Sequence, residues 1–105
     1  MVYNMYTLHI HREGIMIHRI EGFIWLEWVV EKLSVRHGIE LEEVEEAFFH
    51  PPHKVRRSGS GKMLMYGRSQ SGRYLLIVFA LEGRQVKVIS ARDMTEAERR
   101  LFRQK

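Results

Sequence analysis

The sequence predicts an α+β domain, in which a small sheet carries packed helices. Segments of alternating apolar and polar residues indicate strands near the N-terminus and through most of the second half. Helical spacing of apolar residues in the first half, and a helix start signal near the C-terminus, indicate the helices. With 105 residues, of which 45% are hydrophobic, the chain is long enough for one domain with a modest core.

The first elements are a hairpin and a helix. Residues 7–19 alternate, turn at a Glu-Gly pair and alternate again, which predicts a hairpin or two short strands. After Trp25 the period changes, and apolar residues fall at i, i+3, i+4 and i+7: Leu26, Val29, Val30 and Leu33. We therefore expect a helix that Gly38 ends in the left-handed conformation.

A second helix is predicted over residues 41–49, because Pro51 and Pro52 would end it. Its apolar residues Leu41, Val44 and Phe48 should be buried, with the glutamates facing out. The following segments read as strands: residues 62–68, 73–81 and 84–92. The middle one is apolar on both faces, which is typical of a central strand.

The C-terminal helix is predicted from its start signal. Thr95 and Glu98 have the spacing of a capping box, in which each side chain bonds to the other residue's backbone N–H. We expect three apolar residues to dock this helix: Ala97, Leu101 and Phe102. Its arginines should be largely exposed.

Charge is divided unevenly along the chain. Residues 1–52 contain 4 Lys and Arg against 9 Asp and Glu, a net of −5, and residues 53–105 contain 13 against 4, a net of +9. An excess of this size attracts polyanions such as nucleic acid, unless the acidic half neutralises it across the fold. No cysteine is present, which excludes disulfides and thiolate chemistry and fits a reducing cytoplasm. No apolar run suits a membrane span, so we expect a cytoplasmic protein without a membrane partner.

Arg92 raises a specific question. It has the same parity as the apolar Val86 and Val88 and lies where the last strand must end. A permanent cation there either closes an ion pair, to Glu31 or to a helix glutamate, or faces an anion.

Several short motifs, taken together, resemble the BrnT-type toxins of bacterial toxin–antitoxin pairs. They are Trp25, "RHGI", "EEVEEAFF", "GRS" and "VISARDMTEAERR". The likeness covers residues 21–105, so residues 1–20 are interpreted as an N-terminal extension. The resemblance implies a RelE-like fold, with a small antiparallel sheet, packed helices and, here, an added hairpin.

The resemblance also implies a function. It predicts a toxin that acts as a metal-independent endoribonuclease, needs no cofactor and inhibits translation. The implied partners are RNA and a BrnA-like antitoxin of the ribbon-helix-helix type, with operator DNA bound only through the antitoxin. A homodimer is a further prediction.

Candidate residues follow from what RNA cleavage needs: cations for phosphate charge and a proton carrier. The catalytic candidates are Arg68, Arg92, His37 and Lys62. The RNA-binding candidates are Arg56, Arg57, Arg73, Tyr66, Arg99, Arg100 and Arg103. Lys62 also fits a solvated basic rim, and His37 also fits a structural role at a helix C-terminus.

Two other interpretations stay open. His9, His11 and His18 could share a metal, but no carboxylate has matching spacing, and we predict no metal site. The first helix has Leu26, Val29 and Leu33 where the family commonly has polar residues. A toxin-like binding module without catalysis, pairing with an antitoxin-like partner or with nucleic acid, is therefore the alternative function.

Overall fold

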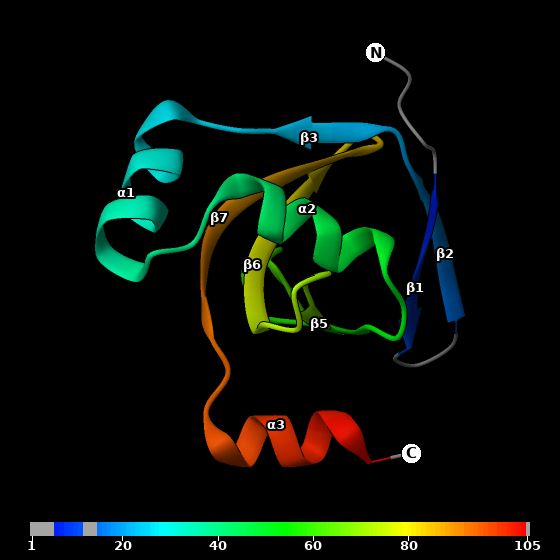
Figure 1. Ribbon diagram of the computed structural model, residues 1–105. Helices are drawn as coiled ribbons and strands as arrows, with labels where there is room; N and C mark the ends of the chain where they lie inside the picture. The colour runs from blue at the N-terminus through cyan, green and yellow to red at the C-terminus, as the bar shows by residue number, and fades with distance from the viewer. Residues whose placement is uncertain (1–5, 12–14, 105) are drawn as a thin grey trace.

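The computed structural model describes residues 6–11 and 15–104, which form a five-stranded sheet with helices on both faces and a separate hairpin (Figure 1). The strands are β1 (Tyr6–His11), β2 (Ile15–Ile20), β3 (Gly22–Ile24), β4 (Lys54–Arg57), β5 (Met63–Arg68), β6 (Tyr74–Glu82) and β7 (Gln85–Asp93). The helices are α1 (Glu27–His37), α2 (Leu41–Phe49) and α3 (Glu96–Arg103). None of the described helices is long and apolar enough to cross a membrane.

The five-stranded sheet has the order β3-β7-β6-β5-β4, and all neighbours are antiparallel except β3 and β7. The prediction of an α+β fold with a small antiparallel sheet is confirmed, with one short parallel strand added. The apolar segment predicted as a central strand is β6, the middle strand of the sheet.

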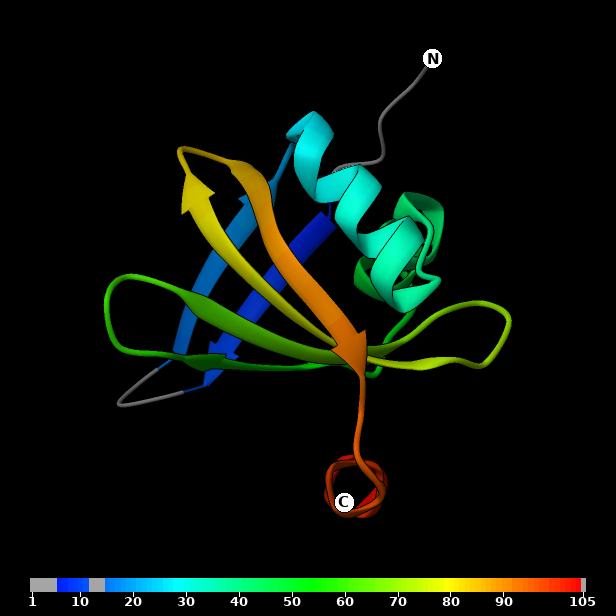
Figure 2. The ribbon, with the colours of Figure 1, turned by 90° about the vertical axis from the view of Figure 1, so that its left-hand side faces the viewer.

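The main core lies between one face of the sheet and helices α1 and α2. Phe48 of α2 packs edge-on against Phe23 and Phe79, with ring centroids 5.3 Å apart in both pairs. Gly67 lets α2 approach β5, because a Cβ there would lie 3.2 Å from the Ala47 carbonyl oxygen and 3.0 Å from Met65 Cε. The opposite face of the sheet carries α3, seen end-on in Figure 2.

A β-bulge decides which face Arg92 takes. Val78 pairs with Ser90 and Phe79 with Val88, so Ile89 is an extra residue in β7. After the bulge, Ala91 turns into the core, and Arg92 points to the α3 face. The parity inferred from sequence alternation is therefore corrected: Arg92 lies on the opposite face from Val88.

The predicted helix boundaries are confirmed at three points. Gly38 is left-handed, with φ 63°, and ends α1, while α2 spans the predicted residues 41–49. Thr95 and Glu98 form the predicted capping box. The docking of α3 differs from the prediction, because Leu101 is 58% exposed and Ala97 is also exposed. Phe102 is the buried residue of α3, edge-on to Tyr74 at 5.9 Å.

The N-terminal strands form the predicted antiparallel hairpin, β1 with β2. The predicted Glu-Gly turn falls at residues 13–14, outside the described residues. Strand β1 lies beside β4, and Ile20, which ends β2, is fully buried in the main core. The hairpin therefore adjoins the edge of the five-stranded sheet.

Candidate functional site

Three arginines surround one tyrosine on the α3 face of the sheet. The guanidinium carbons of Arg99, Arg68 and Arg103 lie 4.6, 5.0 and 5.9 Å from the centre of the Tyr74 ring. A hydrogen bond from Arg103, and the charges of all three arginines, lower the pKa of the Tyr74 phenol. In the described part of the chain, no carboxylate pairs with these arginines. The cluster is thus a concentration of uncompensated positive charge around an aromatic ring.

The fold positions each member of this cluster. Arg68 ends β5 and pairs directly with Tyr74, the first residue of β6. The two residues are joined by a tight turn, in which a Cβ at Gly72 would lie 3.3 Å from Arg68 Nη2, so glycine leaves room for the guanidinium. Arg99 and Arg103 are four residues apart on α3, and therefore lie on the same helix face.

The cluster belongs to a longer groove between α3 and the sheet. One hollow is lined by Pro52, Lys54, Arg68, Tyr74, Phe102, Arg103 and Gln104. A second hollow shares Lys54 and Phe102 with the first and adds Arg56, Tyr66, Glu98 and Leu101. We refer to these two hollows together as the α3 groove. Its walls combine several cations with two tyrosines, which suits a phosphate backbone with adjacent bases.

Lys54 fixes one end of α3 against the sheet. Its Nζ donates to the carbonyl oxygens of Leu101 and Gln104, at 3.1 and 3.2 Å. A cation there satisfies carbonyls that the end of a helix leaves without partners. Lys54 was not among the residues predicted from the sequence, although it shares its strand face with Arg56.

Arg92 closes an ion pair with a glutamate of α3. Its Nη1 and Nη2 donate to the two carboxylate oxygens of Glu98 at 2.8 and 2.9 Å. Hydrogen bonding to Arg92 is the main cause that lowers the pKa of Glu98 to about 2. Of the two alternatives for Arg92, the described structure contains the ion pair, and its partner is Glu98 rather than Glu31.

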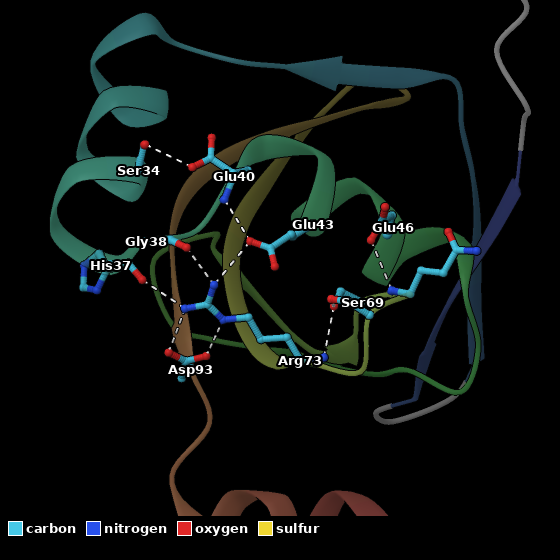
Figure 3. A network of polar contacts seen from close by, with 11 residues as sticks. Ser34, His37, Gly38, Glu40, Glu43, Glu46, Ser69, Arg73 and Asp93 are labelled. Carbon is cyan, nitrogen blue, oxygen red and sulfur yellow. Dashed lines mark hydrogen bonds and ion pairs between the residues drawn. The ribbon is translucent and has the colours of Figure 1, made fainter.

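Arg73 lies on the opposite face of the sheet and serves the fold (Figure 3). Its guanidinium bonds both carboxylate oxygens of Asp93, at 2.7 and 3.0 Å. It also donates to the backbone oxygens of Gly38 and His37, at 2.7 and 3.0 Å, and to Glu43 at 3.3 Å. All five N–H groups of the guanidinium are thereby used.

The structure brings together only part of the predicted site. Arg68, Tyr66, Arg56 and Arg103 line the α3 groove, with Arg99 at its Tyr74 end. Arg92 shares their sheet face but is bound to Glu98, whereas Arg57 has the strand parity of the buried Val55. Arg100 is exposed on α3 and has no contact with Tyr74 among those described.

Two of the predicted catalytic residues lie away from the groove. His37 is the last residue of α1, and its backbone oxygen accepts a hydrogen bond from Arg73. His37 therefore lies with the Arg73 contacts, on the face of the sheet opposite to the α3 groove. Lys62 precedes β5 at the end remote from Arg68, about 20 Å along the strand. Another histidine lies nearer: His50 lines a hollow with Arg68 and Ser69. The described residues contain no group of three or more metal-ligating side chains.

Comparisons with known proteins agree with this architecture. A family model described as "Ribonuclease toxin, BrnT, of type II toxin-antitoxin system" matches residues 27–98. The crystal structure of the Brucella abortus ribonuclease toxin, BrnT, resembles this chain with a TM-score of 0.60 at 18% identity. The likeness covers 71% of this chain and 97% of the Brucella chain. A search of curated proteins found no match.

Proposed function

Because this chain belongs to the BrnT family of ribonuclease toxins of type II toxin–antitoxin systems, we propose that it cuts RNA in the α3 groove. In this proposal the protein is the toxin of its pair, cleaves without a metal ion and inhibits translation by destroying RNA. The family match includes Arg68, Tyr74 and Arg92 but ends before Arg99 and Arg103, so the groove combines family and C-terminal residues.

The cluster around Tyr74 is the observation that carries the proposal. An RNA backbone brings regularly spaced negative charges, and its unpaired bases stack on aromatic rings or guanidinium planes. Arg68, Arg99 and Arg103 offer guanidinium groups without carboxylate partners beside one ring. Tyr66, with Arg56 at 5.8 Å from its ring centre, repeats the combination farther along the groove.

Cleavage in this groove would use Arg68 to stabilise charge. When the 2′-oxygen attacks phosphorus, negative charge builds on the phosphate oxygens, and a fixed guanidinium lowers that barrier. Arg68 suits this role because it is held beside Tyr74 and is not bound to a carboxylate in the described structure. A metal ion is one source of such positive charge, and arginines are another, which is why we propose a metal-independent reaction.

The partner of this toxin is proposed to be a small antitoxin encoded with it. The BrnT family belongs to type II toxin–antitoxin systems, and this supports an antitoxin partner. The ribbon-helix-helix type is what the resemblance of the sequence motifs implies. Contact with operator DNA would then pass through the antitoxin.

The test is cleavage of RNA by the purified protein with excess chelator present, on free RNA and on ribosome-bound message. The proposal expects cleavage that the chelator does not abolish and that added antitoxin stops. Absence of cleavage on both substrates would contradict the enzymatic function, and loss of cleavage with chelator would contradict metal independence.

The Arg92–Glu98 pair favours a second candidate function. A toxin-like protein without catalysis would use the groove to bind RNA or a partner, and an arginine neutralised by its own helix is compatible with that role. Salt-dependent RNA binding with no cleavage, on free or ribosome-bound RNA, would support this binding module.

A further inference from the structure

We propose that His50 is the general base of RNA cleavage, acting beside Arg68 at the end of the α3 groove. This inference rests on the proposed function and names the proton carrier that the reaction needs. It replaces the expectation from sequence that His37 fills this role. Three observations carry it: where the chain fixes His50, which residues share its hollow, and how that hollow joins the groove.

The backbone holds His50 in place at the end of α2. It is the residue that ends the helix, and its N–H donates to the Glu46 carbonyl oxygen at 3.0 Å. Pro51 and Pro52 follow directly, and their rings restrict the backbone angles of the segment. An exposed histidine between a helix end and two prolines is thus presented at a defined position.

The hollow at His50 is lined on one side by Pro51 and Pro52 of the same segment, and on the other by the turn after β5, with Arg68, Ser69 and Gln70. That turn is well fixed. Ser69 is 5% exposed, and its Oγ accepts from the Arg73 N–H at 3.1 Å. The Gln70 N–H donates to Glu46 Oε1 at 3.1 Å, which ties the turn to the same helix that ends at His50.

The hollow adjoins the α3 groove. Pro52 and Arg68 line both the hollow at His50 and the hollow at Tyr74. An RNA strand bound against Tyr74 and Arg68 would therefore continue past His50. The charged residue that lines the hollow together with His50 is Arg68 from β5. Glu46 of α2 bonds to the Gln70 N–H of the same hollow, Lys54 of β4 lines the adjoining hollow, and His53 follows in the His50 segment.

The chemistry assigns one proton transfer to His50. The 2′-hydroxyl oxygen bonds to phosphorus while its proton passes to an imidazole nitrogen, and the bond from phosphorus to the 5′-oxygen breaks. The leaving oxygen takes a proton from water, and the hydroxide formed then neutralises the imidazolium. The products are a 2′,3′-cyclic phosphate and a 5′-hydroxyl. Histidine suits this step because its ordinary titration lies near neutral pH.

The experiment measures the rate of RNA cleavage against pH for the intact protein, His50→Gln and His37→Gln, under saturating RNA. The intact protein should show a limb in which the rate rises with pH, because the base must be unprotonated to accept the proton. His50→Gln should lower the rate at least about 100-fold and remove that limb, with RNA affinity and melting temperature unchanged. His37→Gln should keep the limb.

The outcomes separate this inference from the proposed function. If the intact protein cleaves and His50→Gln keeps both its rate and its pH limb, His50 is not the base. A limb removed by His37→Gln alone would return the role to His37. If the intact protein cleaves no RNA under any condition, the proposed function itself fails.

Discussion

Arg92 and Glu98 form a two-pronged ion pair that ties the last strand to the helix that follows it, with contacts of 2.8 and 2.9 Å. The same Glu98 carboxylate also accepts a hydrogen bond from the Thr95 backbone N–H, at 2.8 Å, in the capping box. One side chain thus starts α3 and fixes its angle to β7. The bulge at Ile89 is what turns Arg92 toward it.

Replacing Glu98 with glutamine should lower stability and flatten its acid dependence. The folded-state pKa of Glu98 is about 2, below its ordinary value of 4.5. The ionised carboxylate therefore stabilises the fold above pH 4.5, and this contribution is lost as the pH falls toward 2. We expect a loss of about 1–2 kcal/mol at neutral pH, because Arg92 is partly exposed. Urea unfolding at several pH values tests this, and an equally steep acid dependence in Glu98→Gln would contradict it.

Arg73→Lys should destabilise the fold although the charge is kept. Lysine has three donors in place of five and lacks the planar fork that grips Asp93 while reaching the end of α1. We expect a loss of about 2–4 kcal/mol in the free energy of unfolding. The matched control is Arg36→Lys on the exposed surface of α1, which should change stability by less than about 0.5 kcal/mol. Equal melting temperatures for the two variants would be evidence against a stabilising role of the Arg73 contacts.

Local signals in the sequence predicted the three helices and most of the strands, but neither β3 nor β4, and long-range contacts decided the site. The capping box at Thr95 and the left-handed Gly38 depend on neighbouring residues, so a short pattern was sufficient. The bulge at Ile89 coincides with a break in the alternation, where apolar Val88 and Ile89 follow one another, and the prediction did not interpret this break as a bulge. The bulge reverses the face of every later residue of β7. Arg73 has partners 20 to 36 positions away, which no local pattern reveals.

Binding of single-stranded RNA should weaken with salt through the arginines of α3. Each phosphate contact contributes about −0.7 to the slope of log affinity against log salt. Replacing Arg99 and Arg103 with glutamine should therefore flatten the slope by about 1.4. The charge-matched control is Arg36→Gln with Arg84→Gln, two exposed positions outside the groove, and should leave the slope nearly unchanged. Equal slopes in the two double variants would assign the α3 arginines to another surface.

Removing residues 1–15 should leave a folded protein with a lower stability. The main core is built by the five-stranded sheet and its helices. The truncated protein still contains Ile20, which is buried in that core. The hairpin lies beside β4, so some stability should be lost. We expect a single cooperative unfolding transition, with a free energy of unfolding within about 3 kcal/mol of that of the full chain. A larger loss would show that the hairpin is an integral part of the domain rather than an extension of it.

RNA cleavage by Arg68 variants tests the central claim most directly. Arg68 lines both the hollow at His50 and the hollow at Tyr74. It lies beside the Tyr74 ring and makes no ion pair with a described carboxylate. With chelator present, Arg68→Ala should lower the cleavage rate about 100-fold or more at an unchanged melting temperature. Arg68→Lys should also be impaired, because lysine lacks the planar fork. Cleavage by Arg68→Ala at the rate of the intact protein would contradict the account, since the groove would then not be where RNA is cut.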